Sequence, residues 1–170
     1  MTTRYALPVR MKDAFHIDAA LISGAITPAL ERTITGGACG AQCVFVGRTR
    51  AERHPEFGDL CALEYEAYEE MAIPVLQRLA REALEESCAG TGAAAFIRHS
   101  TGFVPVGDAS VIIDVHSPHR GAAFHACRCL IDQLKRQVPI WKREHWERGH
   151  STWSPAAHSP ESRAKHESDP

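Results

Sequence analysis

The order of periodic segments from Leu60 to Trp146 constrains the fold of this chain most strongly. Leu60–Tyr68 alternates apolar and polar residues, which predicts a half-buried strand. Five more periodic segments follow: 69–87 (helix), 93–99 and 109–116 (strands), 117–138 (helix) and 140–146 (strand). The order strand-helix-strand-strand-helix-strand is the split βαβ pattern, so we predict an α+β sandwich.

The second helix has the clearest end signals. Ser117 is a favourable N-cap residue, Pro118 suits the first helical position, and Pro139 ends the periodic run. Apolar residues at helical spacing between these ends predict one buried face.

The remaining segments extend this core at both ends. Ala41–Val46 is apolar and predicts an extra strand, whereas 13–26 is interpreted as a helix in a small N-terminal appendage. The whole is an arrangement like an α/β hammerhead. We expect a single domain over 1–153, followed by a disordered tail over 154–170, where Ser, Pro, His and charged residues dominate.

Charge and hydropathy exclude two classes of protein. A formal net charge of -2 lacks the basic excess of a general nucleic-acid binder. The sequence contains no apolar run of membrane-spanning length, and the residues from Met1 to Phe15 lack the apolar core of a signal peptide. We expect a cytoplasmic protein without a nucleic-acid or membrane partner.

The six cysteines do not predict a metal centre or disulfides. Neither Cys39/Cys43 nor Cys127/Cys129 belongs to a pair of CxxC motifs, which would make zinc binding a strong prediction. Disulfides are disfavoured in the cytoplasm. Cys43 and Cys127 are interpreted as small buried apolar residues, and we expect no metal and no cofactor.

Lysine is rare in this chain. The 19 basic residues include only four lysines, Lys12, Lys135, Lys142 and Lys165, and all the others are arginine. A lysine can be tuned to exchange a proton near neutral pH, whereas an arginine cannot. Lys135 and Lys142 fall on either side of the Pro139 turn and are candidates for chemistry. The alternatives are a favourable charge at a helix C-terminus for Lys135 and a water-facing strand residue for Lys142.

Two further segments predict anion contacts. His119 and Arg120 stand at the start of a helix, where free N–H groups and the helix dipole already favour an anion such as phosphate. The alternative is that Arg120 faces solvent or pairs with an acidic residue. Arg48 and Arg50 follow a predicted strand, which by itself is a weak signal.

Five motifs together resemble the large, catalytic subunit family of molybdopterin synthases, across roughly Cys43 to Trp153. The motifs are Val-Gly-Arg-Thr-Arg at 46–50, Leu-Glu-Tyr-Glu-Ala-Tyr at 63–68, the loop 102–108, Ser-Pro-His-Arg at 117–120, and Leu-Lys at 134–135 followed by Val-Pro-Ile-Trp-Lys-Arg-Glu at 138–144. The last pair, at that separation, is the most specific.

The resemblance implies an enzyme, a sulfurtransferase of molybdenum cofactor biosynthesis. It implies a homodimer that binds a small ubiquitin-like sulfur carrier at each end, giving a heterotetramer. The Gly-Gly thiocarboxylate of the carrier would supply two sulfurs to cyclic pyranopterin monophosphate. The family's catalytic lysines correspond to Lys135 and Lys142. Substrate contacts are expected at Arg48, Arg50, His99, His119, Arg120 and Arg143.

Two other functions compete with this interpretation. A non-catalytic relative could dock a ubiquitin-like carrier without transferring sulfur, although the presence of both lysines and Arg120 argues against it. A stand-alone phosphate-ester hydrolase would need a metal or a nucleophile, and the sequence predicts neither.

Overall fold

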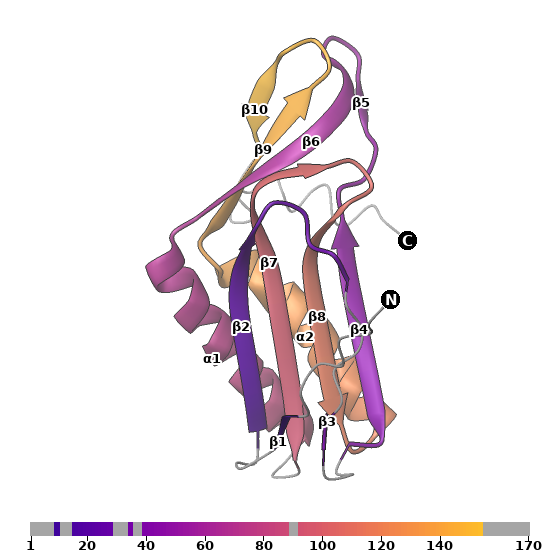
Figure 1. Ribbon diagram of the computed structural model, residues 1–170, viewed down its shortest axis with the longest axis vertical. Coiled ribbons are helices and arrows are strands. Elements are labelled where there is room, and N and C mark those ends of the chain that lie inside the picture. Colours follow the sequence, from indigo (N-terminus) through magenta and orange to yellow (C-terminus); the bar gives the residue numbers. More distant parts are fainter. Residues whose placement is uncertain (1–8, 11–14, 29–33, 36–38, 89–91, 155–170) are drawn as a thin grey trace, which may run out of the picture.

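The computed structural model describes residues 9–10, 15–28, 34–35, 39–88 and 92–154 (Figure 1). The two helices are α1 (Glu69–Cys88) and α2 (Arg120–Gln137). The strands are β1 (Val9–Arg10), β2 (Phe15–Ser23), β3 (Ile34–Thr35), β4 (Ala41–Arg48), β5 (Arg53–His54), β6 (Gly58–Ala67), β7 (Ala93–Pro105), β8 (Ala109–Ser117), β9 (Ile140–Trp146) and β10 (Ser151–Trp153). Neither described helix has the length and apolar character that crossing a membrane requires.

One mixed sheet organises the molecule. Its strand order is β10-β9-β6-β7-β8-β4, with β2 parallel to β7 and β5 paired with β6. The long strand β7 belongs to both halves, because Ala94–His99 pair with β8 whereas Gly102–Pro105 pair with β6. Gly102 has a φ of +75° at this transition, a conformation that favours glycine. The α+β class and the predicted order of elements from Leu60 are confirmed.

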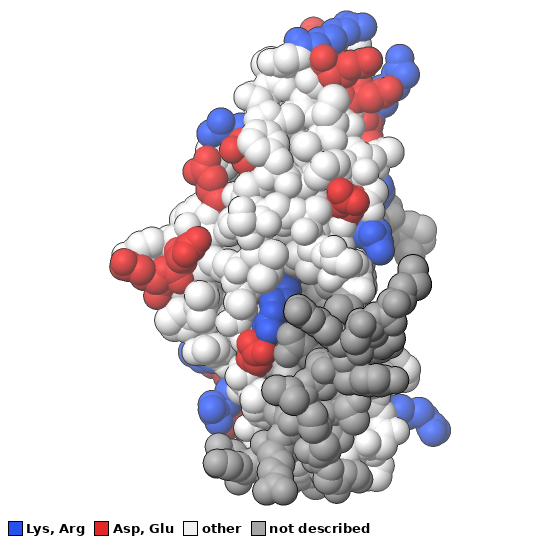
Figure 2. Space-filling view, viewed as in Figure 1, with Lys and Arg blue, Asp and Glu red and all other residues white. Residues whose placement is uncertain are grey.

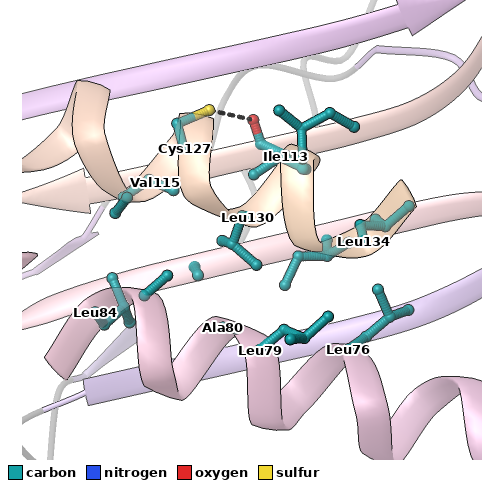
Figure 3. Packing of buried hydrophobic residues seen from close by; sticks show 14 of the residues in the cluster. Leu76, Leu79, Ala80, Leu84, Ile113, Val115, Cys127, Leu130 and Leu134 are labelled. Carbon is teal, nitrogen blue, oxygen red and sulfur yellow. Dashed lines mark hydrogen bonds between the residues drawn. The ribbon is translucent and has the colours of Figure 1, made fainter. Parts of the chain in front are cut away.

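The main core lies between the two helices and the half of the sheet formed by β2, β7, β8 and β4. Figure 3 shows leucines of α1 facing leucines of α2, with Ile113 and Val115 of β8 beside α2. Leu76, Leu84 and Leu130 are fully buried, as are Ile113 and Val115 of β8. Both helices therefore cover one face of the sheet. The C-terminal end of α2 leads directly into β9.

The interpretation of 13–26 as a helix is wrong, because residues 15–23 form β2. This strand pairs in parallel with β7 over its whole length, from Phe15 opposite Ala93 to Ser23 opposite Thr101. Phe15, Ile17, Ala19 and Leu21 pack against the main core. Their spacing of two residues is the period of a strand, which the short apolar run concealed.

The start of α2 also differs from the prediction. Ser117 is the last residue of β8, paired with Ala41, and the N-cap is His119. The Ser117 hydroxyl donates a hydrogen bond of 2.7 Å to the His119 carbonyl instead of capping the helix. Sheet pairing holds Ser117 in an extended conformation, so the helix begins later, at Arg120.

Three more boundaries depart from the sequence-based expectation. The segment 102–108, predicted as a connecting loop, is strand as far as Pro105, because β6 pairs with it. The segment 51–58, outside the predicted elements, contains β5. β10 was not predicted and pairs with β9. Of the predicted tail only Ser154 is described; 155–170 lie outside the described residues, as do 1–8 of the predicted domain.

Candidate active site

Lys135 and Lys142 lie on either side of the corner where α2 turns into β9. Lys135 is in the last turn of α2, and Lys142 is the third residue of β9. Only Val138 and Pro139 separate the two elements. The backbone turns sharply here because Pro139 ends the helix and its carbonyl accepts a hydrogen bond of 3.2 Å from the Tyr68 N–H. The predicted positions of both lysines, helix end and strand start, are confirmed.

The alternation of β9 places Lys142 on the α2 side of the strand. Successive side chains of a strand point to opposite faces, so Lys142 shares a face with Ile140. Ile140 packs against the main core, which α2 covers. Both lysines are exposed. The two lysines thus lie on either side of the α2–β9 turn.

Neither lysine forms an ion pair with any residue that the structure describes, whereas Arg143 of the same strand pairs with two carboxylates. The Arg143 guanidinium lies 3.5 Å from Glu66 and 3.9 Å from Glu64, and it stacks on the Trp153 ring at 4.3 Å. Arg143 points to the opposite face of β9 from Lys142. Its charge is offset by carboxylates, so Arg143 holds β6, β9 and β10 together.

The Arg48–Arg50 segment is fixed by a residue that sequence reasoning missed. The side chain of Thr49 is buried and donates a hydrogen bond of 3.2 Å to the Val104 carbonyl, while its backbone bonds Gly107 and Asp108. The strand register shifts between Gly47 and Arg48, and a Cβ on Gly47 would lie 2.6 Å from a Val111 methyl. The signal available in the sequence was a threonine between two arginines directly after an apolar strand.

The two arginines flanking Thr49 therefore project from a rigid turn. Arg48 donates a hydrogen bond of 2.9 Å to the Gly107 carbonyl. Arg50 is exposed and lies 3.3 Å from Glu52. Such a surface ion pair contributes little, so an incoming anion can compete for Arg50. Figure 2 shows side chains of both charges gathered at the end of the molecule that carries β5 and the β9–β10 turn.

His119 and Arg120 form the N-terminus of α2, and both are exposed. No side chain caps this end, and its first turn contains no acidic residue. The free N–H groups, the partial positive charge of the helix and Arg120 thus all attract an anion to the N-terminus of α2. Within the described part of the chain neither residue forms an ion pair, which suits the binding of an external anion.

One chain does not bring this anion site to the lysines. α2 rises by about 1.5 Å per residue, so Arg120 and Lys135 are separated by about 22 Å along its axis. In Figure 1, α2 starts at the end of the sheet farthest from β10 and ends beside β9. A single phosphate cannot contact both ends of this helix. His119 and Arg120 therefore form a group that is separate from the two lysines within one protomer.

His99 lies in the interior, with 6% of its surface exposed. Its Nδ1 is 2.9 Å from the Ser100 carbonyl, and its ring meets the Tyr65 ring edge-on at 5.1 Å between centroids. Burial lowers the pKa of His99, and the bond to Ser100 only partly opposes this effect. The structure thus favours a neutral His99 that supports Tyr65.

The interpretation of Cys127 as a small buried apolar residue is confirmed, whereas Cys43 is only half-buried. Cys127 is buried, and its thiol lies 4.0 Å from the Ile113 carbonyl, as Figure 3 shows. Burial is the main cause that raises the pKa of Cys127 to about 12. Cys43 is half-buried against the same core. The buried Cys127 fills space between α2 and the sheet, where its raised pKa disfavours the reactive thiolate.

Comparison with known proteins identifies the family of this chain. The family model described as MoaE protein matches residues 23–137. The molybdopterin synthase catalytic subunit of Nostoc sp. is 37% identical over 147 residues, which cover 86% of this chain and 85% of the relative. The subunit of the same name from Bacillus subtilis is 43% identical over 110 residues, covering 65% of this chain and 67% of the relative.

Solved structures share the fold. Molybdopterin synthase from Staphylococcus aureus superposes with a TM-score of 0.67 at 33% identity, covering 85% of this chain and 99% of that one. A complex of subunits 1 and 2 of molybdopterin-converting factor from Helicobacter pylori gives a TM-score of 0.60 at 21% identity, covering 83% and 90%. This chain therefore belongs to the MoaE family, the family of molybdopterin synthase catalytic subunits.

Proposed function

We propose that this chain is the catalytic subunit of a molybdopterin synthase and acts as a sulfurtransferase. Its substrate is cyclic pyranopterin monophosphate, and its partner is a small ubiquitin-like carrier with a Gly-Gly thiocarboxylate terminus. Two successive sulfur transfers convert the precursor into the dithiolene of molybdopterin. The observation that carries this proposal is the pair of exposed lysines without ion-pair partners at the α2–β9 corner.

The chemistry suits these lysines. The precursor phosphate and the carrier thiocarboxylate are both anions, so cationic groups bind them and stabilise charge that develops during transfer. Adding sulfur and opening the cyclic phosphate require proton transfers, which an ammonium or amine at Lys135 or Lys142 performs. A cysteine nucleophile is unnecessary, because the sulfur arrives on the carrier.

We propose further that two protomers combine to complete each site. The distance along α2 keeps Arg120 and His119 away from Lys135 within one chain. In an isologous dimer, residue i of one protomer lies near residue j of its partner, and the reverse contact forms as well. Antiparallel apposition of α2 ends would place the phosphate-binding N-terminus of one protomer beside the lysines of the other, forming two equivalent sites.

The first experiment tests the activity. The purified chain is mixed with a thiocarboxylated carrier and cyclic pyranopterin monophosphate, and the molybdopterin formed is quantified after conversion to a fluorescent derivative. Product should form only with the thiocarboxylated carrier and not with the carboxylate form. A chain that binds the carrier but yields no product is the non-catalytic docking module instead.

The second experiment tests the shared site. Lys135→Ala and Arg120→Ala are prepared separately and then mixed under conditions that exchange subunits. A heterodimer of the two has one wholly intact site, so equal mixing should restore about a quarter of wild-type activity. If one protomer holds the complete site, every mixed dimer lacks an intact site and activity stays at the level of the separate variants.

A further inference from the structure

A cluster of metal-ligating side chains lies between the helices, away from the lysine corner. α1 and α2 run antiparallel, since Arg78 in the middle of α1 bonds Gln137 at the end of α2, while Glu86 near the end of α1 faces His125 in the first half of α2. His125 and Cys129 are one helical turn apart on the same face of α2. One ligand atom from each of Glu86, His125 and Cys129 lies within 4.8 Å of the other two.

We propose that Glu86, His125 and Cys129 form a binding site for Zn²⁺ that joins α1 to α2. The site would supply one oxygen, one nitrogen and one sulfur ligand, leaving a fourth position for water. A mixed set with thiolate and imidazole selects zinc or cobalt over magnesium and calcium, which require oxygen ligands. The inference does not depend on the proposed sulfur transfer.

Two of the three distances between ligand atoms match those around a tetrahedral ion, and the third, between Glu86 and Cys129, is within 4.8 Å. His125 Nε2 lies 3.5 Å from Glu86 Oε1 and 3.4 Å from Cys129 Sγ. Bond lengths of about 2.0 Å to nitrogen or oxygen and about 2.3 Å to sulfur give tetrahedral edges of about 3.3–3.6 Å. Glu86 and His125 are exposed, with 68% and 52% of their side-chain surfaces accessible, so an ion can enter and the side chains can adjust.

The surroundings also favour a cation. The last turn of α1 contains Glu86 but no basic residue, so this carboxylate adds to the partial negative charge of the helix C-terminus. Asp132 brings a second carboxylate close to Cys129. The Arg128 guanidinium lies 3.9 Å from Asp132 and offsets part of this negative charge. A divalent cation would relieve this concentration of negative charge, and Cys129 would bind as a thiolate after losing its proton to solvent.

The test uses the full-length reduced chain after removal of metals by chelation. Co²⁺ is titrated first, because thiolate coordination gives a near-ultraviolet charge-transfer band and tetrahedral geometry gives strong visible bands. One equivalent of Co²⁺ should produce both, and Zn²⁺ should displace it. The thiolate band separates this site from ordinary histidine binding, which matters in a chain with 10 histidines.

Variants decide whether these three residues are the ligands. Cys129→Ser should abolish the thiolate band, and His125→Ala and Glu86→Gln should weaken Zn²⁺ binding by about 10–100-fold or more. The matched controls are Cys61→Ser and Glu85→Gln, which change an exposed thiol and an exposed carboxylate outside the cluster. Zn²⁺ should also raise the melting temperature of the wild type and of both controls.

Two results would overturn the proposal. If Co²⁺ gives no thiolate band with the wild type, the three side chains form only a hydrogen bond and an ion pair. If the band survives in Cys129→Ser or disappears in Cys61→Ser, another thiol is the ligand.

Discussion

The chain uses arginine for nearly all its positive charges, and the two described lysines stand at one corner. The structure distinguishes them from neighbouring cations by their partners. Arg143 is held by Glu64, Glu66 and Trp153, whereas Lys135 and Lys142 have no ion-pair partner among the described residues. A residue that exchanges protons must reach its substrate, so this freedom fits the proposed chemistry.

Replacing either lysine tests whether it performs chemistry. Lys135→Ala and Lys142→Ala should each lower the rate of product formation by about 10²–10⁴-fold, the range for general acid–base groups. Arginine at either position should rescue poorly, because it keeps the charge but not the proton exchange. The measurement is the rate of molybdopterin formation, with folding checked by circular dichroism.

Arg136→Ala is the matched control, since Arg136 is an equally exposed cation in the same turn of α2. It should retain nearly full activity. Normal rates in both lysine-to-arginine variants would show that the site needs charge alone.

His99 predicts a pH dependence of stability. Its folded-state pKa is lowered by burial, so below the unfolded value of about 6.5 the unfolded chain binds more protons than the folded one. Stability is therefore fully present above that pH and is lost as the pH falls toward the folded pKa. His99→Gln should reduce the fall in melting temperature between pH 7 and pH 5, measured by calorimetry.

The exposed His119 provides the comparison. His119→Gln should keep the wild-type pH dependence, because its side chain lies outside the core. An identical pH profile for wild type and His99→Gln would mean that other groups cause the acid sensitivity.

At the scale of elements, α2 determines the positions of both cationic groups. Its buried face contains Ala126, Leu130 and Leu134, which pack against the sheet and α1. The helix thereby fixes Arg120 at one end and Lys135 at the other. Packing of this face decides where the functional residues lie, because the exposed side chains themselves make few contacts.

Leu130→Ala tests how strongly α2 is held. Leu130 is fully buried between α1 and the sheet, and removing its side chain leaves a cavity that should lower the free energy of unfolding by about 2–5 kcal/mol. Phe124→Ala, on the same helix but 62% exposed, should change it by only about 0.5 kcal/mol or less. Urea denaturation measures both. Equal losses would mean that Phe124 is covered in the assembled protein.

At the scale of the whole molecule, the proposed partner must deliver a flexible terminus to the lysine corner. Glycine allows a backbone to pass through a narrow channel without side-chain clashes, so a Gly-Gly end suits this role. The attraction between the terminal anion and the lysines should weaken with added salt.

Extending the carrier by one residue tests where its terminus lies. The longer tail should block sulfur transfer while docking of the carrier survives, because the docking surface and the reacting end are separate. Binding is measured by calorimetry and turnover by product formation. Normal turnover with the extended carrier would place the reacting end away from Lys135 and Lys142.

The sequence by itself determined the α+β class, the element order from Leu60 and the two lysines beside the Pro139 turn. These features depend on local periodicity and on proline, which act through near neighbours in the chain. Periodicity failed at β2, because a short apolar run between 15 and 23 fits a strand or a helix until a partner strand is present.

Only the tertiary structure decided which side chains meet. It placed His99 in the interior under Tyr65, paired Arg143 with Glu64 and Glu66, and separated Arg120 from Lys135 by the length of α2. It also brought Glu86 of α1 close to His125 and Cys129 of α2. The sequence does not predict this contact, because Glu86 lies far from the other two residues along the chain. Contacts between residues far apart in sequence depend on how helices pack on the sheet, and that packing is a property of the folded chain.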